Sequence, residues 1–334
     1  MGRVWYVFKK ALAMDYREMY KTIKKVQSKT GLGFLKILVD VFHCGIKYGA
    51  GYTDYFLLAL HSIPEKLRGT YITRRINEKY INDLNMREYW DNVDDKIKFN
   101  TIYAAYLNRE WLDLSSIEPT QFESFLQGRK KIVAKTVHGT GGLEVSIIEL
   151  TGTDIQRLYH ELMNKKQTLV EEFIVQHPKM NELYGNSVNT LRVITILGRS
   201  GSVNVVFAAL RIGHCAQVDN LHSGGMLAIV DLSSGKVMDP AADRAGELFI
   251  CHPETGTNIV GFEVPFFKDA IKLVKSAAVV TKELRYVGWD VAFGSEGPVI
   301  IEANHMPGYD AYQGTCYLGD KRGVKERFDL AINS

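Results

Sequence analysis

Cysteine is scarce in this chain of 334 residues. The sequence holds only Cys44, Cys215, Cys251 and Cys316. They lie far apart and form neither a CxxC pair nor a Cys/His group with the spacing of a zinc site. A disulfide framework and a structural zinc site are therefore not indicated, and this cysteine usage fits the reducing cytosol.

Long hydrophobic runs and several other signatures are also missing. No run approaches the roughly 18 apolar residues of a membrane-spanning helix, and the first residues lack the apolar core of a signal peptide. No internal repeat is visible, and no basic segment is interleaved with aromatic residues as in a nucleic-acid-binding module. We therefore expect a cytoplasmic protein that does not bind nucleic acid. The apolar and charged fractions, 46% and 24%, predict a folded chain of two or three lobes.

Positive charge is concentrated at the N-terminal end. Residues 1–50 contain ten Lys or Arg against three Asp or Glu, a net charge of +7, whereas the whole chain carries +3. Residues 4–28 have apolar side chains at roughly helical spacing, and Gly31 and Gly33 predict the end of that helix. The helix either lies on anionic lipid at the inner membrane surface or packs in a helical subdomain with solvated lysines. The second interpretation is favoured, because residues 52–91 offer further apolar helical surface.

The most informative stretch lies near the C-terminus. A side-chain period of two predicts strands at 286–293 and 298–304, joined by the turn SEGP. The hairpin sets Asp290 opposite Glu302, and Asn304 shares a face with Glu302. Three oxygen ligands on one hairpin suit Mg²⁺. The alternative is a solvated hairpin face, and this stretch alone does not decide between the two.

A glycine-rich loop separates two further predicted strands. The segment HGTGG at residues 138–142 would let backbone N–H groups close over phosphates. It is neither a Walker A loop nor a Rossmann fingerprint, because no helix follows it. Lys135 lies in the preceding apolar strand, where a lysine is expected to meet an anion. Lys96 falls in the first turn of a short helix, where a positive charge is unfavourable unless it meets an anion. That helix is predicted to turn inward Ile97, Ile102, Ala105 and Tyr106.

Charged residues interrupt three other apolar strands. Arg192 in NTLRVITILG and Arg211 in SVNVVFAALRIG are each predicted to face a cleft and an anionic group. The two strands are predicted to form a hairpin. In TLVEEFI, Glu171 and Glu172 break an otherwise buried pattern.

The order of these features resembles the ATP-grasp superfamily over about residues 92–310. TLRVITILG, AALRIG, DNLHSGG and IIEANHMPG are similar to segments of the glutamate-adding carboxylate-amine ligases. EEFIVQHPKMNELYGNSVNTLRVIT, with the basic helical N-terminus, is more similar still to the sugar-transfer-associated ATP-grasp proteins. The resemblance implies an α+β fold in which two lobes grip ATP, with a helical N-terminal extension. The expected domains are 1–90 for the extension, 91–168 for the lobe with the glycine-rich loop, and 169–334 for the lobe with the hinge, substrate and Mg²⁺ sites.

The resemblance also implies roles for individual residues. The ATP phosphates would be bound by Lys96 and Lys135. The lid over them would consist of His138, Gly139, Thr140, Gly141 and Gly142. The hinge that receives adenine would be Glu171, Glu172, Phe173 and Ile174. The Mg²⁺ ligands would be Asp290, Glu302 and Asn304. The catalytic side chains near the transferred phosphate would be Arg192, Arg211 and Lys135. The substrate site would include Asn189, Asn220, His222, Gly224 and Gly225.

The activity implied is ATP-dependent ligation of a carboxylate to an amine through an acyl phosphate. Its substrates would be ATP, a small-molecule or glycan carboxylate such as a uronic acid of a surface polysaccharide, and an amine. Two alternatives stay open: a phosphotransferase acting on a sugar hydroxyl, and a non-catalytic nucleotide-binding module, which is disfavoured because all three metal ligands are present. The short SEGP link after the first metal position leaves the number of Mg²⁺ ions open. The acceptor is open too, since residues 1–90 lack the N-terminal domain of peptide ligases.

Overall fold

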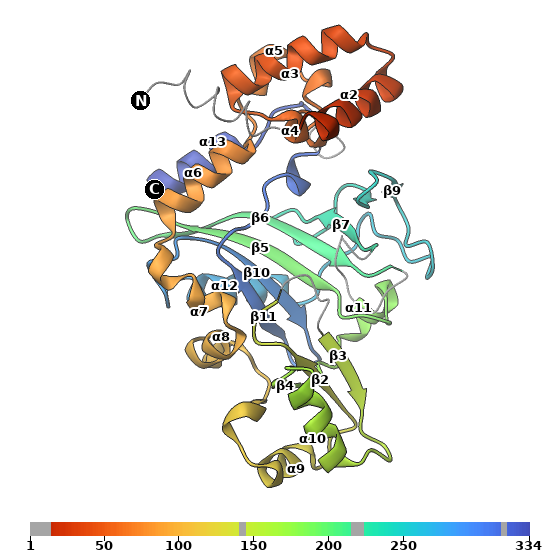
Figure 1. Cartoon of the computed structure of the whole chain (residues 1–334), viewed down its shortest axis with the longest axis vertical. Helices are drawn as coiled ribbons and strands as arrows, with labels where there is room; N and C mark the ends of the chain where they lie inside the picture. Colours follow the sequence, from red (N-terminus) through yellow and green to blue (C-terminus); the bar gives the residue numbers. More distant parts are fainter. Residues whose placement is uncertain (1–14, 140–144, 215–223, 315–318) are drawn as a thin grey trace. The chain divides into compact units, whose positions relative to one another are not determined.

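A computed structural model describes residues 15–139, 145–214, 224–314 and 319–334. The chain divides into two compact units (Figure 1). One unit, here called the helical unit, comprises Met1–Asp83 and Gly308–Ser334. The other, here called the sheet unit, comprises Leu84–Pro307. The predicted boundaries after residues 90 and 168 stay predictions; the structure adds that the C-terminal segment packs with the helical unit.

The helical unit is built around two helices of equal length, α2 (Tyr16–Thr30) and α3 (Phe34–Tyr48). Asp15 caps α2 by accepting hydrogen bonds from two backbone N–H groups of the first turn. Gly31, with φ of +71°, ends the helix in the left-handed conformation that glycine adopts without strain, as the sequence predicted. The remaining elements are α4 (Tyr52–Leu57), η1 (Leu60–Ser62), α5 (Glu65–Arg68), α6 (Arg74–Leu84), η6 (Ala311–Gln313) and α13 (Lys325–Asn333). No described helix of the chain is both long and apolar enough to cross a membrane.

The core of the helical unit confirms that α2 packs on its own protein. Met19, Ile23 and Val26 are buried on one face of α2, against Ile37, Val41 and Cys44 of α3. The C-terminal segment joins the same unit: the Phe328 ring stacks on Tyr80 at 6.2 Å, and Tyr309 donates a hydrogen bond of 2.5 Å to the buried Asp54. Residues distant in sequence thus complete the helical unit.

The sheet unit contains an antiparallel sheet of seven strands in the order β11-β10-β5-β6-β7-β8-β9. Its strands are β5 (Thr190–Leu197), β6 (Val203–Ile212), β7 (Met226–Ile229), β8 (Ala241–Ala242), β9 (Leu248–Phe249), β10 (Tyr286–Phe293) and β11 (Pro298–Asn304). Both predicted hairpins, β5–β6 and β10–β11, are therefore confirmed. The hairpins pair with each other through β10 and β5, which places the carboxylates of one beside the arginines of the other.

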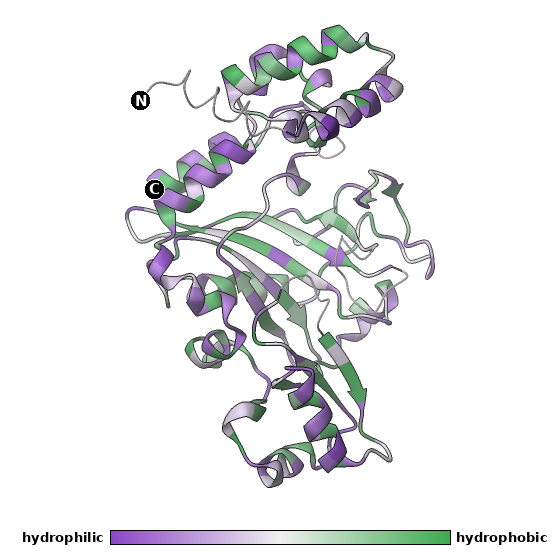
Figure 2. Cartoon of the chain, in the orientation of Figure 1, coloured by the Kyte–Doolittle hydropathy of each residue, from purple (hydrophilic) through white to green (hydrophobic). Residues whose placement is uncertain are grey.

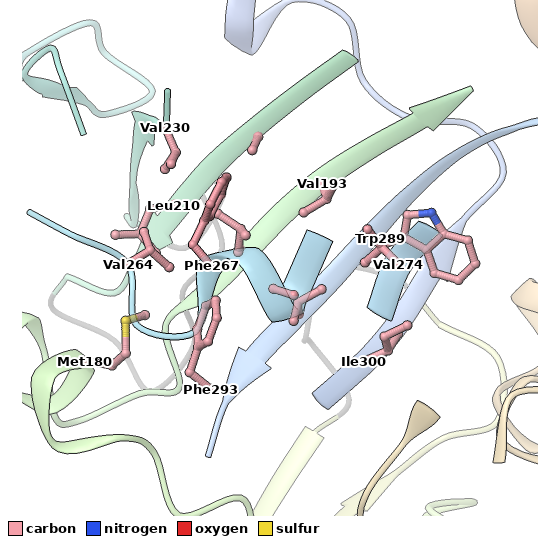
Figure 3. Close-up of a cluster of buried hydrophobic side chains, with 14 of the residues drawn as sticks. Met180, Val193, Leu210, Val230, Val264, Phe267, Val274, Trp289, Phe293 and Ile300 are labelled. Carbon is pink, nitrogen blue, oxygen red and sulfur yellow. The ribbon is translucent and has the colours of Figure 1, made fainter. Parts of the chain in front are cut away.

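Helix α12 (Phe267–Ala277) and the large sheet enclose the main core (Figure 3). Val274 of α12 and Trp289 of β10 both belong to this core, and both side chains are fully buried (Figure 3). The indole N–H of Trp289 donates to Thr195 Oγ1 at 2.8 Å, so the ring is held without a buried unsatisfied donor. Val287, Val291 and Phe293 share this core, which confirms the predicted apolar face of the strand.

A smaller antiparallel sheet has the strand order β1-β4-β2-β3. It comprises β1 (Trp111–Asp113), β2 (Lys131–Lys135), β3 (Val145–Glu149) and β4 (Leu169–Glu172). Helices α9 (Pro119–Leu126) and α10 (Ile155–Asn164) bury Phe122, Leu126, Leu158 and Leu162 in a core with Ile132 and Val170. This core is separate from the main one, as expected for a second lobe.

Short helices connect these layers: η2 (Arg87–Tyr89), α7 (Asp91–Asp94), α8 (Lys96–Ile102), η3 (Ala104–Tyr106), η4 (Leu114–Ser116) and α11 (Pro178–Leu183). Lys96 begins α8, as predicted. The predicted inward face was wrong in part: Ile102 and Ala105 are exposed, whereas Ile97 is half-buried and Tyr106 packs against the main core. The buried residues of this segment include Phe99, Asn100 and Tyr103. The helix ends at Ile102 and the chain continues as the 3₁₀ turn η3, so residues 97–106 do not follow one helical period.

Candidate active site

The β10–β11 hairpin brings the two predicted metal-binding carboxylates together. Asp290 pairs with Glu302 in the register of the strands, as the sequence predicted. Asp290 is only 4% exposed. A solvated hairpin face is thereby excluded, because a carboxylate with so little exposure must find its partners inside the protein.

Two arginines supply the partners of Asp290. Arg192 lies opposite Asp290 in the β5–β10 register. Its Nε donates to Asp290 Oδ1, and its Nη2 donates to Oδ2 at 2.8 Å. Arg211 Nη1 donates to the same Oδ2 at 2.8 Å. Burial alone would raise the pKa of Asp290, but the positive charges of Arg192 and Arg211 outweigh it and lower the pKa. The anionic group that both arginines were predicted to face is, in this structure, Asp290.

Gly288 makes room for this arrangement. A Cβ at this position would lie 3.2 Å from Pro307 Cβ and 3.4 Å from Arg192 Nη1. A side chain there would therefore crowd Pro307 and touch the guanidinium that holds Asp290. The glycine permits close approach, which is a common reason for glycine inside a strand.

Glu302 has the opposite electrostatic environment. Burial raises its pKa, and the neighbouring negative charge of Asp290 raises it further. Two carboxylates at this spacing repel each other when both are ionised, and a divalent cation would remove that cost. Asn304 continues the same strand face, and its Oδ1 accepts a 2.7 Å hydrogen bond from the Met306 N–H. All the potential ligand atoms are oxygens, and a cation would relieve the repulsion between the two carboxylates. These residues therefore fit Mg²⁺.

The end of β11 is fixed by a neighbouring histidine. His305 is 1% exposed and stacks on Trp90 with 4.3 Å between ring centroids. Its Nε2 lies 3.0 Å from Asp94 Oδ2 at the end of α7. These contacts hold the backbone of Asn304 in place.

The small sheet contributes a second buried group of charges around Glu171. Lys135 Nζ donates to Glu171 Oε2 at 2.5 Å, and Arg109 Nη2 donates to Oε1 at 2.9 Å. Asn100 Nδ2 also donates to Oε1, at 3.0 Å. Burial would raise the pKa of Glu171, but the charges of Arg109 and Lys135 and their hydrogen bonds hold it well below its usual range. The anion that Lys135 meets in this structure is therefore Glu171.

Arg109 is a residue of this site that the sequence did not reveal. Its guanidinium donates to the Ile300 carbonyl at 2.6 Å and to the Ile301 carbonyl at 3.2 Å, in addition to Glu171. It therefore ties β4 of the small sheet to β11 of the large sheet, beside Glu302. An isolated arginine between two short elements carries no periodic signal, and only the fold shows that its side chain is 2% exposed.

The predicted hinge follows directly from β4. Glu172 ends the strand and accepts a hydrogen bond of 3.2 Å from the Glu110 N–H. Phe173 and Ile174 lie outside regular structure and are half-buried. The Phe173 ring also lies 5.6 Å from Lys131 Nζ. Their predicted contact with adenine stays a prediction.

Lys96 stands at the entrance of the glycine-rich loop. Its Nζ donates to the Gly139 carbonyl at 2.9 Å, and its backbone N–H donates to the Val137 carbonyl at 3.2 Å. The His138 carbonyl accepts a hydrogen bond from Thr136 Oγ1. The remaining predicted lid residues, Thr140, Gly141 and Gly142, lie outside the described residues.

The predicted substrate residues fall into three groups. Asn220 and His222 lie outside the described residues, whereas Gly224 occupies a turn just before β7, with φ of +97°, and Gly225 is buried beside it. Asn189 has no exposed surface, and its side chain bonds Gln176, Met180, Tyr184 and Gly213. It braces the start of β5, and its assignment to the substrate site stays a prediction.

A histidine cluster borders the same region. His214, His252 and Glu254 bring potential ligand atoms within 4.8 Å of one another. His252 Nε2 lies 2.9 Å from the Gly213 carbonyl, and Nδ1 accepts from the N–H groups of Glu254 and Thr255. Both ring nitrogens of His252 are thus committed to backbone groups. We interpret the cluster as a brace for the end of β6.

Comparison with known proteins connects this geometry to a family. A family model described as sugar-transfer associated ATP-grasp matches residues 75–314. No curated protein matches the chain.

Several solved structures are similar at low identity. The ATP-grasp ligase PsnB, complexed with minimal precursor, is 12% identical with a TM-score of 0.41; the match covers 77% of this chain and 67% of that chain. The ADP complex of purK, N5-carboxyaminoimidazole ribonucleotide synthetase, is 11% identical with a TM-score of 0.46, over 79% and 58%. D-alanyl-alanine synthetase A from Vibrio cholerae is 10% identical with a TM-score of 0.40, over 72% and 64%. This chain thus spans about three fifths to two thirds of the length of those three.

Proposed function

The chain belongs to the sugar-transfer associated ATP-grasp family, and on that premise we propose that it is an ATP-dependent ligase that joins a carboxylate to an amine. The observation that carries the proposal is the line of buried charges where the two sheets of the sheet unit meet. Lys135 and Arg109 hold Glu171 on one side, and Arg192 and Arg211 hold Asp290 beside Glu302 on the other. Such a concentration of cations suits a polyanionic nucleotide.

The proposed reaction has two steps. A carboxylate oxygen of the acceptor attacks the γ-phosphorus of ATP, so that a C–O–P bond forms and ADP leaves. The amine then attacks the acyl carbon, the C–O bond to phosphate breaks, and inorganic phosphate departs as the amine loses a proton. The acyl phosphate must be shielded from water, which is the role we assign to the glycine-rich loop at residues 138–142.

Cationic side chains carry the first step. We assign Lys96 and Lys135 to the ATP phosphates, since Lys96 stands at the base of the loop and Lys135 ends the strand that leads into it. Arg192 and Arg211 would neutralise charge on the transferred phosphate and on the acceptor carboxylate. Two anions otherwise repel each other, so fixed guanidinium groups lower the barrier to their approach.

We assign Mg²⁺ to Asp290, Glu302 and Asn304. When bound, the ion would supply positive charge to the β- and γ-phosphates. Arg192 and Arg211 keep Asp290 ionised and oriented toward Glu302, so the protein has its anionic ligand ready at neutral pH. One ion or two would fit the proposal.

The remaining assignments concern adenine and the substrates. Residues 171–174 would receive adenine through backbone hydrogen bonds and an apolar slot. Asn189, Asn220, His222, Gly224 and Gly225 would line the acceptor site. We propose a sugar carboxylate, as in the uronic acids of surface polysaccharides, and an amino acid or similar amine as substrates. The reaction would take place in the cytoplasm, where ATP is available.

A panel experiment tests the proposed function. The protein is incubated with ATP, Mg²⁺, each of several hexuronic acids and each of a set of amino acids, while ADP is measured and products are identified by mass. The proposal expects ADP and inorganic phosphate in equal amounts with a new amide. A phosphorylated sugar without inorganic phosphate would instead establish a phosphotransferase.

A further inference from the structure

Helix α3 is apolar on two opposite faces. One face buries Ile37, Val41 and Cys44 in the core of the helical unit. On the other side of the helix, four apolar side chains point to solvent: Leu35, Val39, Phe42 and Ile46, with exposed fractions of 73%, 68%, 41% and 53%. Green, hydrophobic residues accordingly recur along the ribbon of α3 in Figure 2.

The exposed residues form a continuous stripe. Their spacing of four, three and four residues places them in one line along the helix, within about 60° around its axis. We call Leu35, Val39, Phe42 and Ile46 the α3 stripe. Single exposed apolar residues are common on protein surfaces, but a line of four along three turns is typical of a surface that meets an apolar phase or a partner.

Aromatic and basic side chains adjoin the start of the stripe. On α2, Tyr16 and Tyr20 are 54% and 52% exposed. The Tyr20 ring lies 5.6 Å from the ring of Phe34, the first residue of α3. Lys24 Nζ lies 5.7 Å from the same Phe34 ring. Tyrosines and lysines beside an apolar stripe are the composition that proteins use at the boundary between lipid and water.

The charge around the α3 stripe favours an anionic surface over a second copy of the chain. Residues 15–50 contain seven Lys or Arg against three Asp or Glu, a net charge of +4. A second copy of the chain would bring the same positive charge toward this surface and be repelled, whereas an anionic surface would be attracted. An amphipathic helix with its apolar line flanked by lysines lies in the plane of a membrane with its apolar side chains below the headgroups.

We propose that the α3 stripe docks on the surface of an anionic membrane, with Leu35, Val39, Phe42 and Ile46 inserted among the lipids. The basic side chains of α2 and α3 contact the headgroups, and each adds about fivefold to the partition constant at low salt. This inference concerns the helical unit alone and goes beyond the proposed ligase activity. Its failure would leave the ATP site untouched, and failure of the ligase proposal would leave membrane binding untouched.

Vesicle co-sedimentation of the full chain provides the test. Vesicles of phosphatidylcholine alone are compared with vesicles that also contain phosphatidylserine. The wild type is expected to sediment with the anionic vesicles only, and to be released by high salt, which screens charges beyond about one Debye length. The triple variant Leu35→Gln, Val39→Gln, Ile46→Gln is expected to bind at least tenfold more weakly, with unchanged thermal stability because all three positions are exposed.

Two matched controls distinguish binding through the α3 stripe from non-specific binding by exposed apolar residues and from an effect of net charge. The first control is a triple variant that removes three other apolar side chains, each more than 60% exposed: Met238→Gln, Ile250→Gln and Leu330→Gln. This variant should bind vesicles as the wild type does. Lys24→Glu with Lys36→Glu should abolish binding, whereas Lys268→Glu with Lys282→Glu, which changes the net charge equally, should retain it.

Three outcomes would overturn the proposal. The first is a wild type that fails to sediment with anionic vesicles. The second is equal binding by the stripe variant and its apolar control. The third is a concentration-dependent dimer of the wild type, without vesicle binding, that the stripe substitutions convert to monomer; the stripe would then be an interface between two copies.

Discussion

Asp290 lies directly opposite Glu302 on the paired strands β10 and β11, and the two carboxylates have opposite electrostatic environments. Arg192 and Arg211 lower the pKa of Asp290, whereas burial and the charge of Asp290 raise the pKa of Glu302. One acid is therefore held ionised while its neighbour resists ionisation. Of the two carboxylates, Glu302 is therefore the one whose charge depends more on an added cation.

Glu302→Gln should abolish Mg²⁺-dependent ATP turnover and leave the fold intact. The amide keeps the size of the side chain but removes the charge that a cation requires and that Asp290 opposes. We expect thermal stability without Mg²⁺ to equal or exceed that of the wild type at pH 8, and turnover to fall at least 100-fold, or about 2.7 kcal/mol in barrier height.

Turnover and thermal denaturation check this prediction on one preparation. Glu296→Gln, at the turn of the same hairpin, is the control and should behave as the wild type does. Normal Mg²⁺-dependent turnover by the Glu302→Gln protein would remove the metal assignment.

Lys135→Met should weaken ATP binding by at least tenfold while lowering stability by no more than about 2 kcal/mol. Glu171 keeps Arg109 and Asn100 as partners of Oε1 when Lys135 is removed, so its charge stays compensated. Calorimetric titration with a nucleotide analogue and chemical denaturation measure the two quantities.

Lys130→Met, just before the same strand, is the control. Lys130 is exposed, so its loss should change stability by less than about 1 kcal/mol and leave nucleotide affinity unchanged. If Lys135→Met unfolded the protein at wild-type nucleotide affinity, Lys135 would be a structural partner of Glu171 and nothing more.

Glu171→Gln should destabilise the protein in a pH-dependent way. The pKa of Glu171 is depressed in the folded protein, so its contribution to stability is fully present above the unfolded pKa of about 4.3 and is lost as pH falls below that value. At pH 7 the variant should lose about 3–5 kcal/mol, because the buried Arg109 would be left without its anion. Urea denaturation from pH 7 to pH 3 should show the difference from wild type shrinking. A constant difference across this range would contradict the ion-pair account.

A double-mutant cycle at Arg109 and Glu171 should show strong coupling. Arg109→Met leaves Glu171 with Lys135 and Asn100, whereas Glu171→Gln leaves Arg109 with backbone carbonyls. Removing both charges together should cost about 2 kcal/mol less than the sum of the single losses. Additive losses would mean that Arg109 stabilises the protein through Ile300 and Ile301 alone.

The two hairpins of the large sheet could be predicted in detail from the sequence. The side-chain alternation along β10 and β11, together with the SEGP turn between them, was enough to set Asp290 against Glu302, although it did not predict the register shift after Asp290. Arg192 and Arg211 were recognisable because a charge in an apolar strand must be compensated, although the pattern could not say that Asp290 is the compensating group.

Contacts between segments that are distant in the sequence could not be predicted from it. Arg109 contacts Glu171 of the small sheet, more than 60 positions away in the sequence, and Ile300 of the large sheet, more than 190 positions away. No local sequence rule predicts such a pairing. The packing of α13 with the helical unit was missed for the same reason. The inward face of α8 was misjudged because the helix ends earlier than its apolar residues suggested.

An isotope-transfer measurement tests the ligase proposal most directly. The hexuronic acid that most stimulates ADP release is labelled with oxygen-18 in its carboxyl group and incubated with ATP, Mg²⁺ and the matching amine. An acyl phosphate carries one carboxyl oxygen into the departing phosphate, so the account predicts one oxygen-18 atom in each inorganic phosphate, formed in equal amount to the amide. Unlabelled inorganic phosphate, or a phosphorylated sugar that retains both labelled oxygens, would contradict it.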